Sequence, residues 1–263
     1  MDKSSPYSIP FTVTFLGTGT SHGIPVIACE CAVCQSKDNK DKRFRSSILI
    51  ESAQTSVAID VGPDFRMQML REKVNKLDAI VLTHEHRDHL AGLDDIRVFN
   101  YRKKGAFDIY CTKHVEGHVR EGWPYIFKPA PYPGVPSVEF KNFDKAAFNI
   151  GDLQFEPIDL LHYKLPVKGF RIGSFAYLTD VSLIPEESFN KLTGLDSVVI
   201  GALRKKPHIS HFSLDEAIEA AKRINAKNTY FIHMSHDMGF HKEVEKELPE
   251  NMHLSFDGLK LKF

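Results

Sequence analysis

The chain has 263 residues, of which 42% are hydrophobic and 26% are charged, as in an ordinary globular protein. Its 34 basic and 34 acidic side chains balance, which argues against nucleic acid or an anionic membrane as the main partner. The sequence has no apolar run near the roughly 20 residues that span a bilayer, and the opening MDKSSPYSIPFTV lacks a signal-peptide core. We therefore expect a cytoplasmic protein.

In the first half of the chain, runs with strand character alternate with helical patterns. The pattern predicts a hairpin from its second and third strands, and a helix after the fourth. The expected strands lie at residues 11–16, 46–50, 55–60 and 77–83, and the expected helices at 64–72 and 90–101.

The second half begins after a loop at 122–136 that contains five prolines and two glycines. A helix is predicted after Ser213, because Ser213 and Glu216 have the spacing of a capping box. Strands are expected at 153–161, 174–179, 197–200 and 228–232. Without a recognisable linker, we predict a single α/β domain over residues 1–263.

Four of these strands run into a side chain that can bind metal: His84, His162, Asp180 and His233. The carboxyl ends of strands in such folds often meet at one edge, where binding sites form. One histidine at a strand end would mean little. Four together predict a metal site.

The segment THEHRDHLAGL, residues 83–93, adds further ligands. His84 and His86 are two residues apart and point the same way in an extended segment, whereas Asp88 and His89 follow a turn. Imidazole and carboxylate groups suit zinc and similar ions. The segment is not a zincin motif, because Asp88 stands four residues after His84. It offers ligands for two adjacent metals.

This segment resembles the His-x-His-x-Asp-His signature of the metallo-β-lactamase superfamily, and His162, Asp180 and His233 match the later ligands of that family in order. The resemblance implies a four-layer αββα sandwich with a dinuclear metal site. It also implies that Asp180 bridges the two ions. By family role, His84, His86 and His162 would bind one metal, and Asp88, His89 and His233 the other.

Three of the four cysteines, Cys29, Cys31 and Cys34, crowd into a C-x-C-x2-C pattern that suggests a metal site in a reducing compartment. Three thiolates leave the fourth position of a tetrahedral zinc open. Cys111 and His236 are the candidates for that position, and Cys111 lies in a probable strand where a free cysteine is often simply buried.

The cysteine triad followed by His236, three residues after His233, resembles the phosphoribosyl cyclic phosphodiesterases linked to carbon-phosphorus lyase. The stretches GTGTSHGIPVIACECAVC, VGPDFRMQML and GLDDIR add to this likeness. The resemblance implies that His236 completes a structural zinc site with the three cysteines. It also implies a homodimer.

His211 lies two residues before the expected helix N-cap Ser213, where anions are favoured. In phosphodiesterase branches of the superfamily a histidine at the matching place acts near the scissile phosphate, and His208 competes for this assignment. Asp60, at its own strand end, fits a partner for a ligand histidine. Four basic side chains could bind a second phosphate, and the sequence does not rank them: Arg66, Lys164, Lys168 and Arg204.

We therefore expect a metal-dependent phosphodiesterase that uses a metal-bridged hydroxide on a small cyclic phosphodiester, such as a phosphoribosyl 1,2-cyclic phosphate. Asp88 and His211 would be catalytic, with two zinc or manganese ions and one structural zinc. The alternatives are a thioester or lactam hydrolase, a zinc scaffold without catalysis, and a transfer RNA 3′-processing endonuclease. The endonuclease is disfavoured because residues 163–179 leave no room for its substrate-binding arm.

Overall fold

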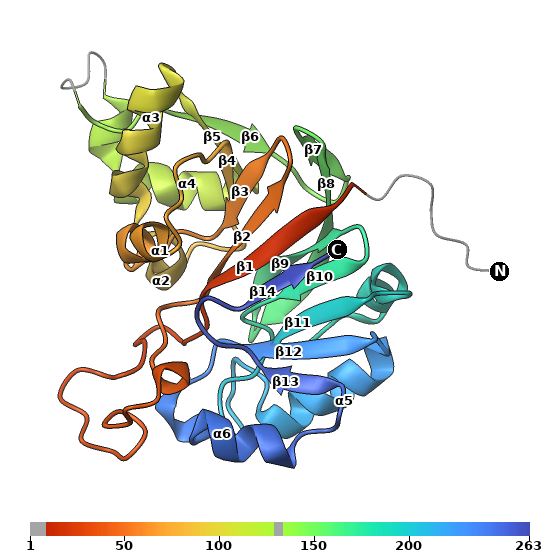
Figure 1. Ribbon diagram of the computed structural model, residues 1–263. Helices are drawn as coiled ribbons and strands as arrows, with labels where there is room; N and C mark the ends of the chain where they lie inside the picture. Colours follow the sequence, from red (N-terminus) through yellow and green to blue (C-terminus); the bar gives the residue numbers. More distant parts are fainter. Residues whose placement is uncertain (1–8, 129–133) are drawn as a thin grey trace.

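The computed structural model describes residues 9–128 and 134–263, which form two facing seven-stranded sheets (Figure 1). The first sheet has the order β14 (Lys260–Lys262), β1 (Phe11–Gly17), β2 (Ser47–Ser52), β3 (Ser56–Ile59), β4 (Ala79–Val81), β5 (Phe107–Cys111) and β6 (Val138–Asn142). The second has the order β13 (Met252–Leu254), β12 (Asn228–Ile232), β11 (Ser197–Gly201), β10 (Phe175–Leu178), β9 (Leu165–Ile172), β8 (Leu153–His162) and β7 (Phe148–Ile150).

Helices cover the outer face of each sheet. The first sheet packs against α1 (Phe65–Arg71), α2 (Arg87–Leu90), α3 (Arg97–Lys103) and α4 (Lys113–Gly122), and the second against α5 (Leu214–Ile224) and α6 (His241–Val244). Short 3-10 helices occur at Asn39–Asp41, Leu93–Ile96, Pro124–Phe127, Glu186–Leu192, His236–Met238 and Glu245–Glu247.

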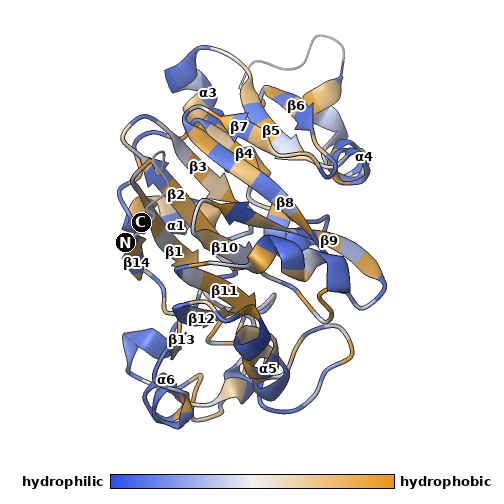
Figure 2. Cartoon of the chain, turned by 90° about the vertical axis from the view of Figure 1, so that its right-hand side faces the viewer, coloured by the Kyte–Doolittle hydropathy of each residue, from blue (hydrophilic) through white to orange (hydrophobic). Residues whose placement is uncertain are grey.

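Hydrophobic side chains form three main clusters, which follow from this layering. One cluster fills the space between the sheets and includes Phe15, Phe155 and Tyr177, all fully buried. The other two lie between each sheet and its helices. In Figure 2, hydrophobic residues are frequent along the central strands, whereas α4 and α6 are largely hydrophilic. The expected αββα sandwich is confirmed.

Most predicted elements are present with similar bounds. The hairpin of β2 and β3 is antiparallel, as expected, and the capping box of Ser213 and Glu216 begins α5. The prediction of one helix over 90–101 is wrong, because the chain turns at Gly92 between α2 and α3. A side chain at Gly92 would meet the Gly62 carbonyl oxygen at 2.3 Å, so this crossing requires glycine.

The predicted loop at 122–136 contains a 3-10 turn at Pro124–Phe127, and its residues 129–133 lie outside the described residues. Across residues 9–128 and 134–263, no helix is long and apolar enough to cross a membrane. The assignment of residues 1–263 to a single domain stays a prediction.

Candidate metal centre

The predicted ligands lie at the carboxyl ends of strands in both sheets. His84 and Asp180 follow β4 and β10 by a few residues, His162 ends β8, and His233 comes directly after β12. Asp180 and His233 have positive φ angles of 49° and 63°. Such a conformation is costly for residues other than glycine, and here it turns each side chain out of its strand at the site.

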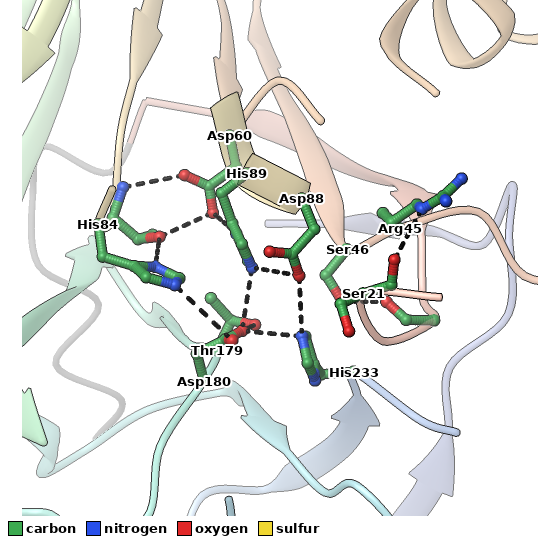
Figure 3. A network of polar contacts seen from close by, with 12 residues as sticks. Ser21, Arg45, Ser46, Asp60, His84, Asp88, His89, Thr179, Asp180 and His233 are labelled. Atoms are coloured by element: carbon green, nitrogen blue, oxygen red, sulfur yellow. Dashed lines mark hydrogen bonds and ion pairs between the residues drawn. The ribbon is translucent and has the colours of Figure 1, made fainter. Parts of the chain in front are cut away.

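Asp180 is the centre of the cluster (Figure 3). Its Oδ1 lies 3.3 Å from His89 Nε2 and 3.2 Å from His233 Nε2. Its Oδ2 lies 3.8 Å from His84 Nε2. The two carboxylate oxygens thus face different groups of histidines, which is the arrangement that a bridging ligand requires.

The structure brings together all the side chains predicted for the dinuclear site. Ligand atoms within 4.8 Å of one another form three overlapping groups that share Asp180. These groups are Asp88, His89, Asp180 and His233; His84, His86 and Asp180; and His162, Asp180 and His211. His162 also lies beside the second group, since its ring centroid is 5.1 Å from that of His86.

Several buried nitrogen atoms at this centre lack a hydrogen-bond partner in the part of the chain that the structure describes. They are His84 Nε2, His89 Nε2 and both ring nitrogens of His233. A buried polar atom without a partner costs roughly 1–3 kcal/mol, so a group of them needs an explanation. Divalent ions such as zinc, which imidazole nitrogens and carboxylates bind well, would satisfy these atoms. The residues present therefore fit the metals that the motif implies.

Contacts behind the cluster orient its histidines. His89 Nδ1 donates to Asp60 Oδ2 at 2.7 Å, so the expected partner of a site histidine is present. Thr83 Oγ1 donates to the same Asp60 oxygen at 2.8 Å and therefore accepts from His84 Nδ1 at 2.9 Å. Both contacts leave Nε2 free to face the site, as in metal centres generally.

Two of the orienting groups escaped the sequence reasoning. Thr83 also donates its backbone N–H to Asp60 Oδ1 at 2.9 Å, and the Ser210 carbonyl oxygen accepts from His162 Nδ1 at 2.6 Å. Thr83 stands directly before His84, and this position was a usable signal. The Ser210 carbonyl group is 48 residues away from His162, and the sequence carries no signal that would pair the two.

The two carboxylates carry the negative charge of the centre. Burial raises the pKa of Asp180, but His233 and His89 outweigh it and hold that pKa well below its usual range. Burial likewise raises the pKa of Asp88, and His89 and His233 reverse the effect. Both side chains are therefore ionised and available to cations.

A close backbone approach fixes the segment that bears Asp88 and His89. Val61 donates its N–H to the His89 carbonyl oxygen at 2.8 Å. A side chain at Gly62 would meet the Asp88 carbonyl oxygen at 2.0 Å. Since no side chain fits there, Gly62 allows the turn after β3 to hold the ligand segment.

His211 lies at the centre and His208 at its rim. The His211 ring centroid is 4.4 Å from that of His162 and 4.8 Å from that of His233. His208 is exposed, and its ring centroid lies 5.4 Å from that of His211. Burial, with help from His233, lowers the pKa of His211 to about 3. The side chain is therefore neutral at pH 7 before substrate arrives.

The second cluster contains the three cysteines. His236 Nδ1 lies 3.3 Å from Cys29 Sγ and 3.4 Å from both Cys31 Sγ and Cys34 Sγ. Tetrahedral zinc would separate such atoms by about 3.5 Å. The Cys34 N–H donates to Cys31 Sγ and lowers the pKa of that thiol to about 7. Cys111 instead lies fully buried in the core under the first sheet.

Two of the side chains that could bind a second phosphate already have hydrogen-bond partners within the protein. Lys168 Nζ lies 2.5 Å from Asp159 Oδ1 and donates to the Asp144 carbonyl oxygen at 3.0 Å. Arg204 donates to the Pro207 carbonyl oxygen and so holds the loop that leads to His211. Lys168 is thus a poor candidate for gripping substrate.

Known proteins resemble this chain over much of its length. The family described as Beta-lactamase superfamily domain matches residues 55–234. The crystal structure of a new diphosphatase from the PhnP family is 41% identical, with a TM-score of 0.91 over 97% of each chain.

Two curated relatives carry other names. An octanoyltransferase of Porphyromonas gingivalis is 38% identical over 248 residues, which are 93% of this chain and 50% of that protein. A ribonuclease Z of Bradyrhizobium diazoefficiens is 33% identical over 85 residues, which are 32% of this chain and 23% of that protein. The chain thus spans half or less of these two relatives. From the family match, the shared fold and the ligand geometry, the chain belongs to the metallo-β-lactamase superfamily as a PhnP-like hydrolase, whose fold implies divalent metal ions.

Proposed function

We propose that this hydrolase is a metal-dependent phosphodiesterase for a small phosphodiester, with phosphoribosyl 1,2-cyclic phosphate as the first candidate. The observation that carries the proposal is the place of His211. Seven side chains already suffice for two ions, yet His211 stands against two of them, His162 and His233. An eighth group at that place suits a reaction that needs a hydrogen-bond donor beside the metals.

Each predicted ligand then has a role. His84, His86 and His162 would hold one ion, Asp88, His89 and His233 the other, and Asp180 both. When bound, the pair supplies an acidified water and stabilises negative charge on the phosphoryl oxygens. Zinc and manganese both suit this ligand set.

Asp88 and His211 would handle the protons. Asp88, held ionised by its histidine neighbours, can accept a hydrogen bond from the attacking water and orient it. Neutral His211 can donate one N–H to a phosphoryl oxygen. It would protonate the leaving oxygen only after the charge of the bound phosphate had raised its pKa.

The fold around the site supports a small substrate. Residues between His162 and Asp180 are taken up by β9, β10 and their turns within the second sheet. They form no projecting arm for a polynucleotide. The named relative in the PhnP family is a diphosphatase, so a diphosphate diester is a second substrate class for the same site.

The cysteine cluster has a different proposed role, which is structural. Cys29, Cys31, Cys34 and His236 would enclose one zinc ion completely, and an enclosed ion has no open position for substrate.

Homodimer formation also remains a proposal, which sedimentation of the purified chain would test.

A second candidate reaction is the hydrolysis of an octanoyl ester or thioester. The observation that favours it is the relative named octanoyltransferase, which matches 93% of this chain. The same metals could attack an acyl carbon, because a ligand set alone does not choose the substrate. His211 would then have no phosphate to bind.

Turnover on a substrate panel tests the proposal. Purified protein loaded with zinc or manganese would be given a phosphoribosyl cyclic phosphate, a nitrophenyl phosphodiester, a diphosphate diester, an octanoyl thioester, a lactam and a precursor transfer RNA. We expect the highest kcat/KM on a small phosphodiester. Preference for the thioester, the lactam or the RNA by tenfold or more would contradict the proposal.

A further inference from the structure

A third group of metal-binding side chains lies outside both clusters described above. Ligand atoms of Glu85, His114 and His118 lie within 4.8 Å of one another. His114 and His118 are four residues apart on α4, so they share one face of that helix. Glu85 stands between His84 and His86, at a bend in the segment between β4 and α2, and its carboxylate lies against His114 of α4.

The distances suit a cation. His114 Nε2 lies 3.1 Å from Glu85 Oε1, and a tetrahedral zinc would separate such a nitrogen and oxygen by about 3.4 Å. His118 Nδ1 donates to the His114 carbonyl oxygen at 3.2 Å, which fixes the ring and leaves its Nε2 as the available ligand atom. The ring centroids of His114 and His118 lie 4.6 Å apart.

An ion pair between Glu85 and His114 alone does not account for the arrangement. The Glu85 side chain is only 11% exposed, whereas that of His114 is 59% exposed. Glu85 Oε2 is buried and has no hydrogen-bond partner among residues 9–128 and 134–263. A cation held by this carboxylate would satisfy the oxygen, and His118 provides the further ligand that a simple ion pair does not need.

We infer that Glu85, His114 and His118 form an additional site for a divalent transition-metal ion such as zinc. Two imidazoles and one carboxylate are a common zinc ligand set, and the fourth position is open to water or to an anion. A bound ion would link α4 to the chain segment that carries His84 and His86.

Metal content at controlled free zinc tests this site. Full-length protein would be equilibrated by dialysis against buffered zinc and analysed for its elements. We expect the wild type to bind one ion more than His118→Ala under the same conditions. His118 is exposed and helical, and alanine is a good helix former, so this variant should fold.

His253→Ala is the matched control. His253 also contacts a glutamate, with Nδ1 at 2.9 Å from Glu245 Oε1, but it has no second histidine in that contact. This variant should keep the wild-type zinc content. Zinc should also raise the melting temperature of the wild type beyond that of His118→Ala, because binding to the native state stabilises it.

Equal zinc content in wild type and His118→Ala over the whole range of free zinc would overturn the inference. So would the loss of the same ion in His253→Ala, because the binding would then be unspecific. Neither readout depends on catalysis, so the result stands apart from the outcome of the substrate panel.

Discussion

The dinuclear centre and the cysteine cluster differ in what holds their side chains. The dinuclear centre receives its side chains from strand ends and from α2, in front of two large hydrophobic cores. The cysteine cluster belongs to the long connection between β1 and β2, where the buried apolar residues are few. That small core consists of Ile24, Val33 and Cys34, with Val26, Cys29 and Phe240 against it.

This difference indicates, for each region, whether the protein scaffold positions the metal ligands or a metal ion positions the chain. At the proposed dinuclear centre the scaffold positions the candidate ligands, so bound ions would contribute chemistry more than folding energy. At the cysteine cluster the backbone has little other support, so an ion would position the loop. The base of the loop has a protein-only anchor, because buried Arg43 donates to Thr18 Oγ1 and to the Ser255 carbonyl oxygen.

The largest expected effect on turnover comes from His233→Ala. The variant should lose measurable activity and metal at the dinuclear centre, because a ligand from β12 is missing. Its melting temperature, measured without metal, should stay close to that of the wild type. The removed ring makes no hydrogen bond with the described residues, and His89 still lies against Asp180 Oδ1 when the contact with His233 is lost. A fall in stability as large as that of a cysteine-cluster variant would break the comparison.

His211→Ala should keep full metal content and lose roughly 10²- to 10⁴-fold in rate, the usual span for one positioned acid-base group. If His211 protonates the leaving oxygen, the loss should shrink for a nitrophenyl ester, whose leaving group barely needs a proton. If it only binds phosphate, both esters should suffer alike.

His208→Ala is the matched control for His211→Ala, because His208 stands in the same loop but is exposed. It should retain most of the wild-type activity. An unchanged rate in His211→Ala with both esters would remove His211 from the proposed mechanism.

Asp60→Asn should reduce turnover by about 10- to 100-fold, as loss of a group that orients a metal ligand generally does. Asp60 accepts from His89 and twice from Thr83, whereas asparagine has one acceptor oxygen and would direct an N–H₂ group at a donor. Asp78→Asn is the control, since Asp78 accepts from the Ser56 N–H outside the site. Equal losses in both variants would indicate a general effect on the first sheet.

Much of the fold could be predicted because the signals are local. The run before THEHRDH has the apolar pattern of a buried strand, and α5 begins with a capping box. Strand β9 gave no such signal, since Pro166 and Gly169 interrupt it. It is a strand because β8 and β10 pair with it on both sides, and tertiary pairing overrides propensity.

At the candidate site, too, features with a local sequence signal could be predicted, and features set by tertiary contacts could not. The side chains that gather at the candidate metal centre could be predicted because each stands near the end of a recognisable strand or within one motif. The choice between Cys111 and His236 could not be made from spacing, because 207 residues separate Cys29 from His236. The folded chain brings His236 to the triad through the loop after β12, and it buries Cys111 in β5.

The smallest expected effect on turnover, and the largest on stability, comes from His236→Ala. The variant should lose one tightly bound zinc, which the wild type retains under mild chelation that removes the exchangeable pair. With free zinc at 100 times its dissociation constant, the lost ion would cost about 2.7 kcal/mol. In a chain of this size that corresponds to a fall of about 5–10 °C in melting temperature.

Cys111→Ala separates loss of the zinc from loss of a buried thiol, because Cys111 is buried in the core and belongs to none of the ligand groups found among the described residues. It should keep its zinc while losing some stability through the cavity that it leaves. If Cys111→Ala released the zinc and His236→Ala did not, the cluster would be wrongly assigned. If His236→Ala instead emptied the dinuclear centre, the two regions would not be independent, because the loop that carries the cysteines would then be needed to hold His233 in place.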